Sequence, residues 1–168
     1  LSYLDVVVQG ETQETTMSLR MRISDALKQA MKDKAADRLS TLRLINAAIK
    51  DKDIAARATG KDDGVSDAEV LGILSKMAKQ RQESARAYEE GGRLDLAERE
   101  REEVEVIEEF LPRQLTVPET AAAVDDAIKE IGATSIRDMG KVMGLLKERY
   151  TGQMDFGAVG PVIKDRLS

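Results

Sequence analysis

The chain has 168 residues, 42% of them hydrophobic, so it can bury a core as one domain or as two small ones. It contains no cysteine and no histidine, which excludes disulfides, the usual zinc ligands and nucleophiles that depend on a histidine base. The net charge of −5 argues against general affinity for nucleic acid, so any RNA binding must use a local basic patch. No apolar run approaches the roughly 20 residues that span a bilayer. We expect no metal, no cofactor and no membrane partner.

The composition predicts an all-α protein. Ala, Leu, Glu, Lys, Arg and Met are abundant, whereas runs of β-branched residues are nearly absent after Val8. Residues 1–16 precede the first helical pattern and carry three acidic residues and no basic one. We interpret 1–16 as a disordered leader or a remnant of expression.

Four helices are predicted before residue 112. Apolar residues recur at helical spacing in each, and Ser66 with Glu69 has the spacing of a capping box at the start of the third. Glycines at both ends of Thr59–Val65 indicate a loop, and Gly91–Gly92 ends the third helix. The predicted helices are residues 18–34, 38–58, 66–90 and 93–110.

The helix 38–58 carries a basic face in addition to its apolar stripe. At about 100° per residue, four polar residues fall within a quarter-turn of one another, away from the apolar residues. These residues are Arg43, Asn46, Lys50 and Arg57. The face is either the solvated side of an amphipathic helix or a surface for an anionic ligand.

A boundary is predicted where this helical region meets Pro112. Proline removes an amide donor and disfavours the α conformation of its predecessor, so the helix should end near Phe110 or Leu111. Thr116 and Glu119 then have the spacing of a new capping box. We therefore expect an N-terminal helical domain, 17–112, and a small C-terminal three-helix domain, 113–168.

Three short helices are predicted in the C-terminal domain. The first covers 117–131 and ends at Gly132, and the second runs from Ser135 to Tyr150. The apolar residues of the second, from Ile136 to Tyr150, occupy one arc that can face a core. The third begins after Asp155 and ends at Leu167, but Gly157, Gly160 and Pro161 should make its first turn irregular, so that regular helix begins only at Pro161.

The second of these helices carries two glycines among basic residues. Gly140 and Gly144 lie opposite the apolar arc, and each costs a helix about 1 kcal/mol relative to Ala. One explanation is the close approach of another helix. The other is that the sugar-phosphate backbone of a nucleic acid approaches the helix here while neighbouring basic side chains contact its phosphate oxygens. The candidate nucleic-acid-binding residues are Arg137, Gly140, Lys141, Gly144 and Lys147.

Three segments of the chain resemble the GatB/YqeY family of small bacterial proteins. They are RLSTLRLINAAIKDKDIA (38–55), SKMAKQRQESARAYEEGGRLDLAEREREEVEVIEEFLPRQL (75–115) and MGKVMGLLKERYTGQMD (139–155). The resemblance covers about Met17 to Leu167 and implies an all-α protein. Its C-terminal part is similar to the tail of the B subunit of glutamine-dependent aspartyl/glutamyl-tRNA amidotransferase, a carbon–nitrogen ligase with glutamine as amido-N-donor.

The resemblance also implies a function. In that enzyme the tail contacts the tRNA body, while ATP-dependent activation and transamidation occur elsewhere; at the matching positions Gly140, Lys141, Gly144 and Lys147 would face the tRNA. We therefore expect a tRNA-binding or amidotransferase-associated module in the bacterial cytoplasm. This chain has no P-loop and no visible catalytic constellation, so we name no catalytic residue. The alternative is a protein-interaction module without RNA binding, in which the acidic helix 93–110 or the basic face of helix 38–58 docks a protein partner.

Overall fold

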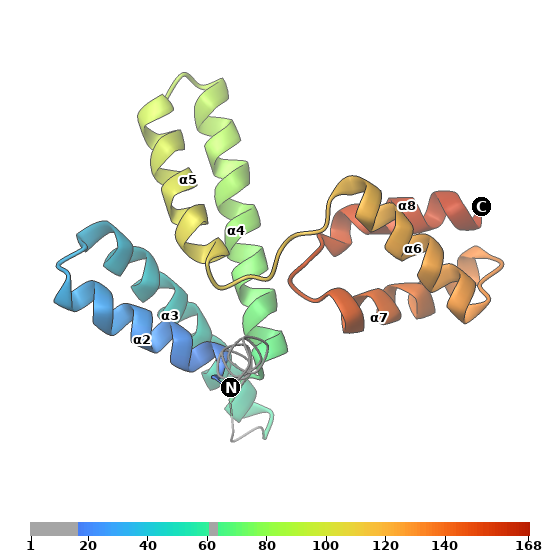
Figure 1. The fold of residues 1–168 in the computed structure, drawn as a ribbon, viewed down its shortest axis with the longest axis horizontal. Coiled ribbons are helices and arrows are strands. Elements are labelled where there is room, and N and C mark those ends of the chain that lie inside the picture. Colours follow the sequence, from blue (N-terminus) through green and yellow to red (C-terminus); the bar gives the residue numbers. More distant parts are fainter. Residues whose placement is uncertain (1–16, 61–63) are drawn as a thin grey trace, which may run out of the picture. The chain divides into compact units, whose positions relative to one another are not determined.

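The computed structural model describes residues 17–60 and 64–168, and every regular element within them is a helix (Figure 1). This confirms the predicted all-α class. The predicted leader, 1–16, and residues 61–63 of the predicted loop lie outside the described residues. The elements are α2 (Leu19–Lys32), α3 (Ala36–Ala58), α4 (Asp67–Glu90), α5 (Leu94–Glu108), α6 (Val117–Ile131), the 3-10 helix η1 (Ile136–Asp138), α7 (Met139–Tyr150) and α8 (Phe156–Leu167).

The chain divides into two compact units, one that ends at Phe110 and one that comprises Leu111–Ser168. The first unit contains α2 to α5, and the second contains α6, η1, α7 and α8. The assignment of 17–112 and 113–168 as separate domains stays a prediction.

The first unit is built from two helical hairpins, α2 with α3 and α4 with α5 (Figure 1). Each helix has apolar residues at helical spacing, which gives it one stripe to bury. Because α5 also contacts α3, the two hairpins share a core. The fully buried side chains of this core include Ile23, Leu42, Ile45, Val70, Leu74 and Ile107.

Asp53 holds the connection between α3 and α4. Its carboxylate accepts a hydrogen bond from Arg20 Nη1 at 2.9 Å and one from the amide of Val65 at 3.0 Å. The bond from the Arg20 guanidinium is the main cause of a lowered pKa at Asp53. Gly64 lies against this carboxylate with a φ of +79°, and a β-carbon there would be 2.6 Å from Asp53 Oδ1. The turn therefore requires glycine both for its backbone conformation and for space.

Both predicted capping boxes are confirmed. At the start of α4, the Glu69 amide donates to Ser66 Oγ at 3.2 Å and the Ser66 amide donates to Glu69 Oε1 at 3.4 Å. At the start of α6, the corresponding bonds between Thr116 and Glu119 are 3.2 and 3.0 Å. Arg113 adds two hydrogen bonds to the Glu119 carboxylate, each 2.8 Å long.

The second unit packs α6, α7 and α8 around one apolar cluster. The segment that enters the unit is fastened to the α7–α8 loop, because the amide of Leu115 donates to the carbonyl of Gln153 at 2.8 Å. The buried members of the cluster are Ala123, Val124, Ala127, Val142, Leu146, Met154, Val159, Ile163 and Leu167.

The predicted span of the last helix, from after Asp155 to Leu167, is confirmed, because α8 is Phe156–Leu167. The prediction that its first turn is irregular and that regular helix begins only at Pro161 is wrong, because the helix is regular from Phe156. Asp155 caps the helix by accepting a hydrogen bond from the Gly157 amide at 3.0 Å. Pro161 lies inside the helix, where it cannot donate a hydrogen bond to the carbonyl four residues earlier. Gly160 has no β-carbon to collide with the proline ring, so the α conformation continues through this position.

Candidate nucleic-acid interface

The predicted RNA-facing residues lie on α7 and on the turn before it. We predicted a single helix from Ser135, but residues 136–138 form a 3-10 turn and α7 begins at Met139. The Asp138 carboxylate tightens this turn by accepting hydrogen bonds from the amides of Thr134 at 3.0 Å and Ser135 at 3.4 Å. These two bonds lower the pKa of Asp138, so it stays a carboxylate at neutral pH.

The core determines which side of α7 faces outward. Val142 and Leu146 are completely buried, and Met139 and Met143 pack against the same cluster. Of the predicted apolar arc, Ile136 does not reach the core and is 48% exposed. Because the buried residues point inward, the opposite side of α7 is the exposed one.

Gly140 and Gly144 lie on that exposed side. A β-carbon at either position would meet no side chain or neighbouring segment of the described chain within 4 Å. The first explanation for these glycines, the approach of another helix, therefore has no counterpart within the second unit, Leu111–Ser168. The space above them is open to a molecule outside the unit.

Three basic side chains flank the two glycines. Arg137, Lys141 and Lys147 are exposed, and none forms an ion pair with a described residue. We call this side of α7, with Arg137, Gly140, Lys141, Gly144 and Lys147, the glycine face. Three arginines of the second unit form ion pairs away from it: Arg113 with Glu119, Arg149 with Glu130, and Arg166 with Asp125. Lys129 and Lys164 are exposed, like the cations of the glycine face.

One acidic residue shares the glycine face, and our sequence reasoning did not weigh it. Glu148 follows Gly144 by four residues, which places it on the same side of the helix, and it is exposed. The spacing alone would have identified it. Glu148 lies toward the end of α7, and the Asp138 carboxylate, whose pKa the charge of Lys141 helps to lower, lies before its start. With three cations against these two carboxylates, the face keeps a small excess of positive charge.

The secondary basic face is on α3, in the first unit. Arg43, Lys50 and Arg57 are exposed, whereas Asn46 is half-buried. Two large apolar side chains interrupt the same exposed side of α3: Leu44 is 45% exposed and Ile54 is 64% exposed. This surface is therefore mixed rather than uniformly basic.

Two further site types have no representative in the part of the chain that the structure describes. No three acidic residues there are arranged to hold a metal ion. None of the helices is long and apolar enough to cross a membrane.

The sequence matches the family described as Yqey-like protein over residues 20–167. A protein named Altered inheritance of mitochondria protein 41, mitochondrial, from Vanderwaltozyma polyspora is 36% identical over 85 residues, which are 51% of this chain and 44% of the relative. A protein of the same name from Clavispora lusitaniae is 36% identical over 104 residues, 62% of this chain and 54% of the relative. An uncharacterized protein of Schizosaccharomyces pombe is 29% identical over 94 residues, 56% of this chain and 69% of the relative.

The chain thus spans about half the length of the two mitochondrial relatives. All three relatives are fungal, so a bacterial origin and a cytoplasmic location stay predictions.

Proposed function

Because the chain belongs to the YqeY-like protein family, we propose that it is a non-catalytic module that binds tRNA, or assists a tRNA amidotransferase, through the glycine face of α7. The observation that carries this proposal is the open space above Gly140 and Gly144. Each glycine costs about 1 kcal/mol of helix stability relative to Ala, and no residue of the second unit fills the space. A sugar-phosphate backbone could use it, with the flanking cations on phosphate oxygens.

The resemblance of residues 139–155 to the tail of the amidotransferase B subunit supports tRNA as the ligand. The surface suits RNA, because duplex RNA presents phosphates and 2′-hydroxyls across a shallow groove. A helix side that carries glycines in place of larger residues can approach this groove closely. The relatives' names state no ligand, and this chain covers only part of their length. The location that we propose is the cytoplasm.

The test is a salt titration of binding to total tRNA, set against duplex DNA of equal charge. Changing Lys141→Ala together with Lys147→Ala should weaken tRNA binding and lower the salt slope by about one unit for each lost phosphate contact. The thermal midpoint should hardly change, because exposed charges rarely contribute more than about 1 kcal/mol. Normal tRNA affinity in this stable double variant would contradict the proposal.

A steric variant tests the glycines directly. Gly144→Leu should fold normally and lose tRNA affinity, because its side chain fills the open space. The matched control is Gly72→Leu, the same change at an exposed glycine in the second turn of α4, where a β-carbon also meets nothing within 4 Å. Equal tRNA affinity in the two leucine variants would exclude the glycine face as the contact.

A protein-interaction module is the second candidate function. The observation in its favour is the pair of exposed apolar residues, Leu44 and Ile54, beside the basic residues of α3. Helix α5 offers a second surface for a protein partner, because it is rich in acidic residues and Leu94 at its start is 67% exposed. If the wild-type protein binds no tRNA at low salt, this candidate replaces the first.

A further inference from the structure

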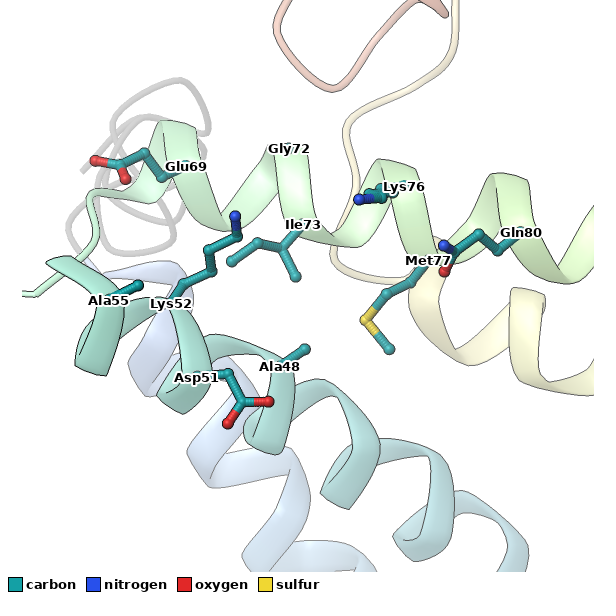
Figure 2. A pocket seen from close by; sticks show the side chains of 10 residues that line it. All are labelled: Ala48, Asp51, Lys52, Ala55, Glu69, Gly72, Ile73, Lys76, Met77 and Gln80. Carbon is teal, nitrogen blue, oxygen red and sulfur yellow. The ribbon is translucent and has the colours of Figure 1, made fainter.

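A groove of about 670 Å³ lies between α3 and α4 in the first unit (Figure 2). Ala48 and Ala55 of α3, with Ile73 and Met77 of α4, give it an apolar floor. The α4 residues that line it recur at i, i+3, i+4, i+7, i+8 and i+11 from residue 69, which is the pattern of a face that packs against a helix. This stretch of α4 is about 16 Å long, or three helical turns.

Gly72 opens the groove to the backbone of α4. It lies in the second turn of the helix, is exposed, and a β-carbon on it would meet nothing within 4 Å. With Ala48 and Ala55 opposite, it lets the main chain of an occupant come close to both helices. A β-carbon here collides with no described neighbour, so a longer side chain would extend from it into this space.

Two lysines, Lys52 and Lys76, and two acidic residues, Asp51 and Glu69, line the groove. Figure 2 shows the Lys52 amine reaching from α3 into the space toward α4, and Lys76 lines the same space from α4. Neither lysine forms an ion pair with a described residue. The two carboxylates of the lining, on Asp51 and Glu69, point away from the space between the helices in Figure 2. An acidic group on the occupant would therefore face two unneutralised amines.

We propose that this groove binds one amphipathic helix of another protein, with apolar residues toward the floor and an Asp or Glu between Lys52 and Lys76. This site is separate from the proposed tRNA function. A nucleic acid is a poor occupant, because an apolar floor without aromatic residues offers neither stacking nor a row of phosphate contacts. A helix satisfies its own backbone hydrogen bonds, so it can lie on such a floor.

The probe is a synthetic, acetylated and amidated peptide of 18 residues made of Ala, Leu and Glu, with Leu on one helical face and Glu at its edges. It is titrated into the ¹⁵N-labelled full chain while the amide signals are followed by NMR. Two control peptides have Gln in place of every Glu, or the same composition in an order without helical period. We expect shifts at the amides of Ala48, Ala55 and Gly72, and at least about threefold tighter binding of the Glu peptide than of the Gln peptide.

Two variants locate the site. Gly72→Leu should weaken binding of the Glu peptide at least about tenfold, because it fills the centre of the contact. Gly144→Leu is the matched control and should leave peptide binding unchanged. Lys52→Gln with Lys76→Gln changes only exposed side chains, and it should abolish the difference between the Glu and Gln peptides.

Four results would overturn the proposal. The first three are no binding of the Glu peptide, equal binding of the shuffled peptide, and chemical-shift changes confined to residues outside the groove. The fourth is a change in the groove amide signals that is caused by total tRNA or by self-association of the protein and that the Glu peptide does not reverse. The Gly72→Leu variant should keep its tRNA affinity, so failure of this proposal and failure of the tRNA function give different results.

Discussion

Gly140 in the first turn of α7 and Gly144 in its middle lie on the exposed side of the helix, where glycine is the least favourable residue after proline. Substituting Ala for either should raise the free energy of unfolding by about 1 kcal/mol, because the added methyl group collides with nothing and the unfolded chain loses freedom. Urea denaturation of each single variant measures this. A loss of stability would show that the open side of α7 is already occupied by the protein itself.

Glu119 has both a structural and an electrostatic role at the start of α6. The two hydrogen bonds from Arg113, then those from Thr116, lower the pKa of Glu119 from 4.5 to about 2. Because the pKa is lower in the folded state, the stability that this carboxylate provides is complete above pH 4.5 and is lost as the pH falls toward 2. We expect the second unit to weaken over this range.

The Arg113→Ala variant tests that account at the level of one group. Its expected effect is a rise in the pKa of Glu119, followed by NMR of the side-chain carboxyl during an acid titration. Glu130 is the internal control, because its lowered pKa depends on Arg149 and should not move. An unchanged pKa at Glu119 would mean that the bonds from Thr116 alone lower it.

At the scale of elements, the turn from α3 to α4 depends on Gly64. The variant Gly64→Ala should destabilise the first unit by more than about 1 kcal/mol, because it combines a positive φ with a β-carbon 2.6 Å from Asp53 Oδ1. Gly92→Ala is the control: its φ is +75°, but a β-carbon there meets nothing within 4 Å. Chemical denaturation should therefore give a lower free energy of unfolding for Gly64→Ala than for Gly92→Ala. An equal loss of stability in the two variants would show that Asp53 moves aside.

Local sequence patterns predicted the elements well where neighbouring residues determine the structure. The Ser66 and Thr116 caps depend on bonds within four residues, and both formed as expected. The start of α8 after Asp155 was predicted, but the regularity of its first turns was missed, because Asp155 and Gly160 together make the helix tolerate Pro161, which proline rules alone do not include. The contact between Asp53 and Gly64 could not be predicted from the sequence either, because a periodic pattern does not indicate which side chain packs against a turn.

At the scale of the whole molecule, the orientation of the glycine face could be derived from sequence, because Val142 and Leu146 had to point inward. The groove between α3 and α4 could not be derived, because it depends on how the two hairpins of the first unit pack. The same holds for the mixed character of the α3 surface around Ile54.

A test on the intact chain concerns catalysis. Highly purified protein should not convert Glu-tRNA or Asp-tRNA to the amide with glutamine and ATP, because the sequence contains no P-loop and no cysteine or histidine nucleophile system. Thin-layer separation of labelled aminoacyl products measures this. Amide formation that increases with the amount of protein, and disappears in the Lys141→Ala, Lys147→Ala variant, would instead make the chain an enzyme.

The open glycines also bear on how the protein would respond to selection. Gly72, Gly140 and Gly144 can each accept a methyl group, so directed evolution for heat resistance alone should replace them early. Selection for growth at the ordinary temperature would keep them if either surface binds a partner. A library subjected to both regimes would therefore separate positions that maintain the fold from positions kept for recognition.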